Sequence, residues 1–200
     1  MIEKIAEKIA RFIYRNTACE SEKFDIYKYG IEITVSSIFN IILILLCGFI
    51  VSDIFAGIAF LINFILLRSF TGGYHAKTYL MCNGLFVLTF LIVYVISAML
   101  NMLNLPFGVL ESLVLLNCIP IILFAPVENK RKRLDENKKK RFRIKAIITF
   151  IMLSIVALAL CFFNSKYGTL VIITISAVSV MIVIEISRKR RKRLWHSKKR

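Results

Sequence analysis

The sequence predicts an all-α polytopic membrane protein, with about six transmembrane helices, an N-terminal amphipathic helix and both termini in the cytoplasm. Three observations support this prediction. Hydrophobic residues make up 58% of the 200 residues, whereas soluble domains are nearer half apolar. The excess lies in long apolar blocks. Strongly basic stretches adjoin these blocks, which is the pattern of cytoplasmic loops between membrane helices.

The first thirty residues are expected to form a cytoplasmic segment of a single membrane domain that covers residues 1–200. Within 2–13, apolar side chains recur at helical spacing with charged residues between them. This pattern is typical of an amphipathic helix that lies on a membrane or caps a bundle. It lacks the continuous apolar core of a cleavable signal peptide. Residues 15–30 are polar.

Six apolar spans follow and form a bundle over residues 33–186. They are expected at 33–50, 53–67, 85–103, 107–125, 146–163 and 168–186. A helix that crosses a bilayer needs about 20 mostly apolar residues, so the second span is expected to be tilted, kinked or partly re-entrant. The breaks between spans are marked by Asp53, by Asn104 with Pro106, and by Asn164 to Gly168.

The net charge of +16 orients the bundle, because 19 of the 28 Lys and Arg residues lie in 130–145 and 188–200. Cationic loops stay in the cytoplasm, so the loop 126–145 and the tail 187–200 are both expected there. Counting spans backwards places 68–84 on the same side. The basic runs adjoin apolar spans, so we expect contact with anionic membrane lipid and no binding of nucleic acid.

The five cysteines are odd in number and form no CxxC pair. A disulfide framework and a zinc site are therefore not expected, and the sequence suggests no metal and no cofactor.

The segment 68–84 holds the residues that suggest chemistry. It joins the second and third spans and is too polar to be a simple extension of either. It contains His75, the only histidine outside the tail, and Cys82. A thiol near an imidazole is the nucleophile and base of cysteine acyl transfer. Taken alone, the spacing His-x6-Cys is a weak signal, and two unrelated loop residues remain the alternative.

The distance between the two side chains depends on the backbone. If 75–82 is helical, His75 and Cys82 project from one face but lie about 10 Å apart along the axis. That is too far for a direct hydrogen bond. Either the backbone bends between them, or the substrate brings the two groups together.

Three neighbouring residues have two interpretations each. Gly72 and Gly73 permit a sharp turn with positive φ, and their N–H groups would suit a developing oxyanion. The alternative is a plain break between two helices. Arg68 is either an interfacial anchor whose side chain reaches the head groups or a group that binds a carboxylate.

In these residues the sequence resembles the accessory gene regulator B (AgrB) family of bacterial membrane cysteine endopeptidases. Arg68, Gly72, Gly73, His75 and Cys82 form the pattern R-x3-GG-x-H-x6-C. Two further matches are Tyr29-Gly30-Ile31-Glu32 before the first span and Ala125-Pro126-Val127-Glu128-Asn129-Lys130 after the fourth. The length, the six spans and the basic loop fit as well, so the resemblance covers nearly the whole chain.

The resemblance implies that Cys82 is the nucleophile and His75 the general base and acid. It implies a supporting role for Glu32, which by its position alone is more typical of an interface residue. Ser69 and Asn83 are candidate partners that orient His75, and the sequence selects neither.

The implied activity is that of a thiol protease in quorum sensing. The substrate would be an AgrD-like precursor peptide, from which the enzyme removes the C-terminal tail and closes a cyclic thiolactone or lactone autoinducing peptide. The implied location is the bacterial plasma membrane, with the active site toward the cytoplasm. A non-enzymatic small transporter or peptide-export accessory protein is the alternative. The sequence leaves open whether the protein is a monomer or a homodimer.

Overall fold

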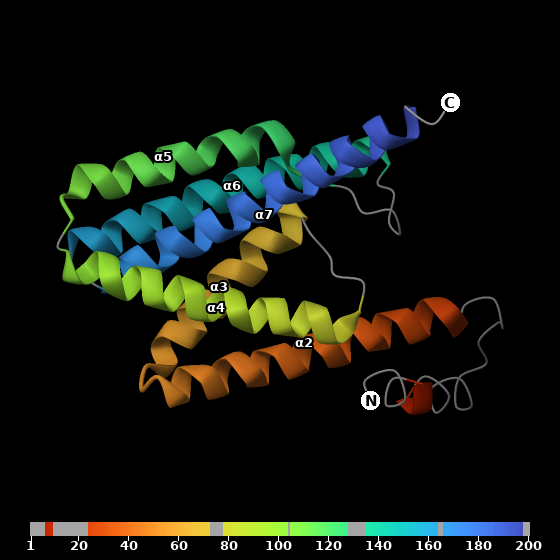
Figure 1. The fold of residues 1–200 in the computed structure, drawn as a ribbon, viewed down its shortest axis with the longest axis horizontal. Coiled ribbons are helices and arrows are strands. Elements are labelled where there is room, and N and C mark those ends of the chain that lie inside the picture. The colour runs from red at the N-terminus through yellow and green to blue at the C-terminus, as the bar shows by residue number, and fades with distance from the viewer. Residues whose placement is uncertain are drawn as a thin grey trace.

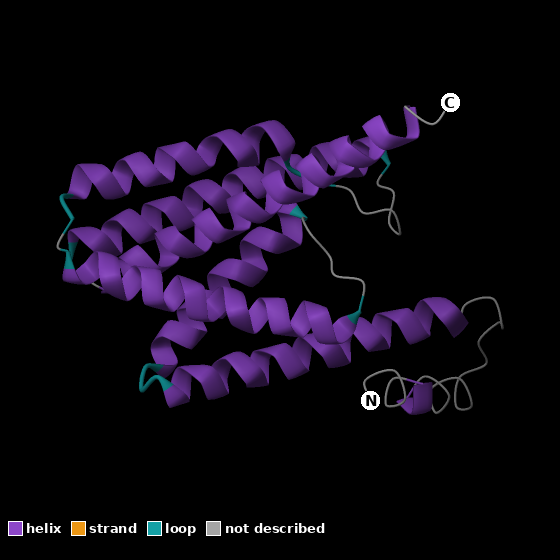
Figure 2. Ribbon diagram, in the orientation of Figure 1, coloured by secondary structure: helices purple, strands orange, loops and turns teal. Residues whose placement is uncertain are grey.

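The chain folds into long helices joined by short connections (Figures 1 and 2). The computed structural model describes residues 7–9, 24–72, 78–103, 105–127, 135–163 and 166–197. Its six long helices are α2 (Phe24–Ile50), α3 (Ile54–Thr71), α4 (Tyr79–Met102), α5 (Phe107–Phe124), α6 (Glu136–Phe162) and α7 (Lys166–Ser197). Each has an apolar stretch long enough to cross a bilayer. The predicted all-α polytopic fold is therefore confirmed.

Several helices are longer than the apolar spans that predict them. Helix α2 begins at Phe24, within the segment expected to precede the bundle, and α6 begins at Glu136, within the basic loop. Helix α7 continues through the basic tail to Ser197. Lys, Arg and Glu are good helix formers, and the Asp135 side chain accepts a hydrogen bond from the Glu136 N–H at the start of α6. Helix ends and apolar boundaries therefore differ. Of the amphipathic helix expected over 2–13, the structure describes residues 7–9, which are helical.

Helix α7 lies at the centre of the bundle. It packs against α3, α4, α5 and α6. Seven of its apolar side chains are buried, namely Leu170, Val171, Ile172, Ile173, Ile175, Val178 and Ile182. In Figure 1, α5, α6 and α7 form one layer, α2 and α4 lie on the other side, and α3 crosses obliquely between them. This path agrees with the tilt expected for the short second span.

The outer surface of the bundle is strongly apolar. Large hydrophobic side chains are more than half exposed on the outer helices, for example Phe49, Met99, Leu115 and Ile155. A soluble monomer rarely exposes contiguous apolar surface on this scale. In a bilayer the same side chains face lipid, so the exposure agrees with a multi-pass membrane protein.

One end of the bundle is closed by a polar cluster around Asp53. Its carboxylate accepts hydrogen bonds from the Ala56 N–H (3.1 Å), from Lys166 Nζ (2.5 Å) and from the Tyr167 hydroxyl (3.2 Å). Burial raises the pKa of Asp53, but the Lys166 ammonium and these hydrogen bonds lower it more, so the pKa lies below its ordinary value. The cluster ties the start of α3 to the start of α7. Helix α7 begins at Lys166, so Gly168, expected in a connection, lies in its first turn.

The opposite end carries the basic segments. The end of α3, the start of α4, the start of α6 and the end of α7 all lie there (Figure 1). The charge pattern predicts that 68–84, 126–145 and 187–200 share one side of the membrane, and the described helix ends of these segments do lie at one end of the bundle.

Candidate active site

Cys82 lies in the first turn of α4. Thr78 caps the helix with its side-chain oxygen, which accepts a hydrogen bond from the Met81 N–H (3.3 Å). The Cys82 N–H makes the first backbone hydrogen bond of the helix, to the Thr78 carbonyl (3.0 Å). The thiol is free and half-buried. Positive partial charge gathers at a helix N-terminus, so α4 places its positive end near this sulfur.

The hypothesis of one helix across 75–82 is wrong. Thr78 has an extended backbone, with φ −124° and ψ 152°, and α4 begins only at Tyr79. The chain therefore bends before Cys82. A bend between His75 and Cys82 is one of the two ways in which the imidazole and the thiol could meet. His75 and Gly73 lie outside the described residues.

The rest of the segment 68–84 is also more helical than its polarity suggests. Arg68 to Thr71 form the last turn of α3, and Tyr79 to Gly84 form the first turns of α4. The expectation that this segment extends neither span is therefore wrong at both ends. Capping explains it: Thr78 satisfies a free N–H group at the start of α4, and the Gly72 N–H satisfies a carbonyl at the end of α3.

An aromatic cluster brings Arg68 and Cys82 to the same level. The Phe64 and Phe86 rings meet edge to face with centroids 4.9 Å apart, and Phe60 packs on both at 5.2 and 5.4 Å. Helices α3 and α4 run in opposite directions (Figure 1). Arg68 is one turn beyond Phe64 and Cys82 one turn before Phe86, so both lie one turn from this contact toward the same end.

The Arg68 side chain is held among α3, α4 and α7. Its Cζ lies 5.6 Å from the centre of the Phe64 ring, and Nη1 donates a weak hydrogen bond to Met181 Sδ (3.5 Å). The guanidinium lies within electrostatic range of the Cys82 thiol and of the Glu185 carboxylate. Arg68 therefore faces the protein interior. This position does not fit an interfacial anchor whose side chain reaches the lipid head groups.

Glu185 is a residue that the sequence analysis missed. It is the only acidic residue of α7 within the described range 166–197, and its side chain is 17% exposed. Its Oε2 lies 3.8 Å from Arg188 Nη1. The available signal was an acidic residue inside an apolar span, because ionisable residues within a membrane are expensive and usually have a functional or paired role.

Helix α2 reaches the site through Asn83. The Ser36 hydroxyl donates to Asn83 Oδ1 (3.0 Å). Asn83 is buried, and its Nδ2 has no hydrogen-bond partner among the described residues. Glu32 lies one turn before Ser36 on the same face of α2, so the structure brings Glu32 to the same end of the bundle as Cys82. Ser69 donates to the Ile65 carbonyl of its own helix (2.6 Å).

Gly72 joins α3 to the segment after α5. Its φ is +68°, its backbone pairs with Val127, and the Val127 N–H donates to the Thr71 carbonyl (2.8 Å). The Gly72 N–H donates to the Arg68 carbonyl (3.0 Å), so in this structure it caps α3 and does not point into an oxyanion site. Two of the motifs that carry the family resemblance, one around Gly72 and one around Val127, thus touch each other.

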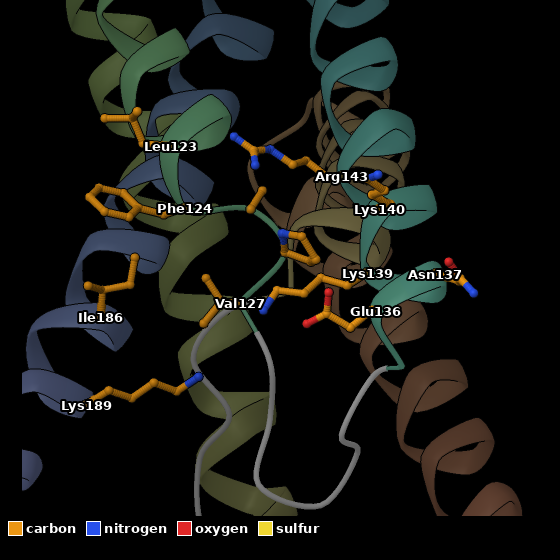
Figure 3. Close-up of a pocket in the computed structure, with 12 residues that line it drawn as sticks. Leu123, Phe124, Val127, Glu136, Asn137, Lys139, Lys140, Arg143, Ile186 and Lys189 are labelled. Atoms are coloured by element: carbon orange, nitrogen blue, oxygen red, sulfur yellow. The ribbon is translucent and has the colours of Figure 1, made fainter.

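A pocket of about 710 Å³ lies beside this junction. Its walls come from the end of α5 with the following residues 125–127, from the start of α6, and from the end of α7. Figure 3 shows Leu123, Phe124 and Ile186 on one side, opposite basic side chains of α6. Within the described ranges no three His, Cys, Asp or Glu side chains gather as they would around a metal ion.

Comparison with known proteins identifies the family. Residues 6–184 match accessory gene regulator B. The chain is 23% identical to an AgrB-like protein of Lactiplantibacillus plantarum, over 92% of this chain and 90% of the relative. It is 23% identical to the accessory gene regulator protein B of Staphylococcus intermedius, over 86% and 88% of the two chains.

Accessory gene regulator protein B of Staphylococcus aureus strain JH9 is 22% identical over 80% of this chain and 84% of its own. No solved structure matches significantly. The family match extends across all six apolar helices and includes both ends of the segment 68–84. The chain therefore belongs to the accessory gene regulator B family.

Proposed function

We propose that this protein is a membrane cysteine endopeptidase that matures a quorum-sensing propeptide. It removes the C-terminal tail of an AgrD-like precursor and transfers the remaining acyl group, which gives a cyclic thiolactone or lactone. Family membership implies a role in quorum sensing, and the environment of Cys82 supports the specific chemistry.

The observation that carries the proposal is the position of Cys82 in the first turn of α4, within electrostatic range of the Arg68 guanidinium. A thiol at a helix N-terminus beside a cation is the usual setting of a reactive cysteine. The other described cysteines have no such surroundings, since Cys47, Cys118 and Cys161 lie in or beyond the middle of their helices.

The reaction proceeds in two acyl transfers. The Cys82 thiolate attacks the carbonyl carbon at the boundary between signal and tail, the peptide C–N bond breaks, and the tail leaves as an amine that takes its proton from His75. A thioester between the peptide and Cys82 remains. A thiol or hydroxyl of the bound peptide, deprotonated by His75, then attacks this thioester, which closes the ring and releases the Cys82 thiolate.

Water must be kept from the thioester, because hydrolysis would give a linear product. The half-buried position of Cys82 in the first turn of α4 supports such exclusion. The basic end of the bundle would face the cytoplasm by the positive-inside rule, where a newly made precursor arrives. Glu32 and Asn83 would then support the site from the α2 side, and Arg68 and Glu185 from the α3 and α7 sides.

The test is cleavage of a co-expressed precursor in cells, followed by mass spectrometry of the products. Cys82→Ala, Cys82→Ser and His75→Ala should each reduce cleavage at least a hundredfold, since nucleophile and base act as one unit. Cys118→Ala is the matched control, because it removes another half-buried thiol from a membrane helix and should leave cleavage within about twofold.

Membrane levels of every variant are compared by immunoblot. If Cys82→Ala accumulates normally and still yields the cleaved peptide, the protein is not a cysteine peptidase. A non-enzymatic role in peptide export would then become the leading explanation.

A further inference from the structure

We propose that the pocket between the ends of α5, α6 and α7 binds the phosphate head group of an anionic phospholipid. The proposal extends beyond the proposed peptidase activity and does not depend on it. The pocket volume of about 710 Å³ falls in the range of about 300–1,000 Å³ that is usual for small-molecule sites.

The charge of the pocket selects an anion. Among the described residues that line it, four are basic, Lys139, Lys140, Arg143 and Lys189, and one is acidic, Glu136. The formal sum over these residues is therefore four minus one, or +3. Arg143 Nη2 donates to the Ile122 carbonyl (2.9 Å), which fixes the guanidinium against the end of α5. A guanidinium carries five N–H donors, so this contact leaves others to bind phosphate oxygens.

The facing wall suits an acyl chain. Leu123 is 62% and Phe124 43% exposed, and Ile186 completes this side of the pocket (Figure 3). Both Leu123 and Phe124 belong to the last turn of α5, whose exposed side chains are apolar from Leu115 onward. A ligand with an anionic head and a hydrocarbon tail can therefore place its head against α6 and run its tail down α5.

The pocket lies at the level along the helices where lipid head groups are expected. Arg143 lies three residues before Ala146, the first fully buried apolar residue of α6, which is about 5 Å along the helix axis. On α7, Ile186 lies two residues before Arg188, where the basic run starts. On both α6 and α7, the boundary between apolar and basic residues thus lies at the level of the pocket. Basic pockets between membrane helices at this level bind anionic lipid head groups.

An acidic peptide is the other macromolecular ligand that the charge would accept. The apolar wall favours the lipid, because a chain of carboxylates would gain nothing from the exposed Leu123 and Phe124 side chains. The lipid proposal also gives the pocket a structural consequence. Val127 lines the pocket and pairs with Gly72, so a bound lipid would brace the segment that holds the end of α3 near Cys82.

The test is native mass spectrometry of the full-length protein in detergent, titrated with phosphatidylglycerol or with phosphatidylcholine of the same acyl chains. Phosphatidylglycerol should bind at least tenfold more tightly. The double variant Lys140→Gln/Arg143→Gln should lose about twenty-five-fold in phosphatidylglycerol affinity, since each basic residue near anionic lipid contributes about a factor of five. Lys140→Gln alone, which leaves the Arg143 contact with α5 intact, should lose about fivefold.

The matched control is Lys138→Gln/Arg141→Gln. It removes two exposed charges from the same turns of α6, but neither residue lines the pocket. It should change phosphatidylglycerol affinity less than threefold. An equal loss in both double variants would show that only the general field of the basic end attracts lipid, and would overturn the proposal.

Two competitors distinguish the sources of the anion. Glycerol 3-phosphate and an oligoglutamate peptide are added to the complex with phosphatidylglycerol, each at millimolar concentration. Neither should displace the lipid. Displacement by glycerol 3-phosphate would indicate a site for a free phosphate, and displacement by oligoglutamate would indicate a peptide site, and either result would refute the assignment to lipid.

Discussion

Replacing Gly72 by alanine should destabilise the junction between α3 and the segment after α5. Gly72 has φ +68° and ψ −149°, a region of the Ramachandran plot that is essentially restricted to glycine. A Cβ atom added there would lie 2.6 Å from the Val127 carbonyl oxygen. Ordinary contacts between heavy atoms lie at about 3.5–4.0 Å. The clash is with backbone, so no side-chain rotation relieves it.

Two contributions set the size of the effect. A residue held in such a backbone region costs about 1–3 kcal/mol. Separation of the two segments also breaks the hydrogen bond from the Val127 N–H to the Thr71 carbonyl, which is worth about 1 kcal/mol. Together they predict that Gly72→Ala lowers the free energy of unfolding by about 2–4 kcal/mol.

The assay is reversible unfolding of the purified protein in mixed micelles with increasing sodium dodecyl sulfate, followed by circular dichroism. Gly84→Ala is the matched control within the same segment. Nothing lies within 4 Å of a Cβ built on Gly84, and this residue is inside α4. Alanine there should be neutral or stabilise the protein by up to about 1 kcal/mol.

The opposite result would refute this reasoning. If Gly72→Ala unfolds within about 0.5 kcal/mol of the wild type, which is the scatter of ordinary surface substitutions, then neither the positive φ nor the contact with Val127 constrains this position. The turn would then owe its shape to the flanking helices alone.

The remaining predictions concern three other contacts. Asp53→Asn keeps a capping oxygen but loses the ion pair with Lys166; because Lys166 is 58% exposed, the cost at pH 7 should be at most about 1 kcal/mol. The folded-state pKa of Asp53 lies below its ordinary value of 3.8, so this stabilisation is present above pH 3.8 and is lost as the pH falls further. In thermal unfolding in detergent, the difference in stability between the wild type and Asp53→Asn should therefore disappear below that pH. Gly168→Ala would place a Cβ 2.6 Å from the Cys161 backbone nitrogen and should cost about 1–3 kcal/mol in the same unfolding assay; an unchanged stability would contradict the close approach of α6 and α7. Arg68→Gln should reduce cleavage of a co-expressed precursor about tenfold, because it removes the cation within electrostatic range of Cys82 and Glu185. Arg68→Lys keeps the charge and should reduce cleavage less than threefold, and equal cleavage by all three proteins at equal membrane levels would show that Arg68 does not support the site.

Hydropathy and charge were sufficient to predict the helices and their order. Each apolar block corresponds to one of the helices α2 to α7, because no other structure satisfies the backbone in lipid over such lengths. The helix ends were less predictable. Basic residues at the start of α6 and the end of α7 continue the helix outside the apolar region, and hydropathy alone cannot distinguish a polar helical turn from a loop.

The sequence also predicted the candidate nucleophile, and its local pattern put Arg68, His75 and Cys82 in one motif. Their partner Glu185 was missed, since it lies about a hundred residues away along the chain, on a helix that only packing brings to the site. The role of Gly72 was left between a plain break of two helices and a sharp turn whose N–H suits an oxyanion. The structure gives it a different contact, a pairing with Val127, which no local pattern contains.

The sequence by itself determined that the chain crosses the membrane several times and that its polar break at 68–84 carries a thiol and an imidazole. These features are local, because they depend on the composition of short windows and on residue spacing. Only the tertiary structure decided which side chains surround Cys82. The aromatic contact between α3 and α4 sets the level of Arg68, and the central position of α7 brings Glu185 to the same level. Packing between distant segments has no signature in a single sequence, so this part of the site required the fold.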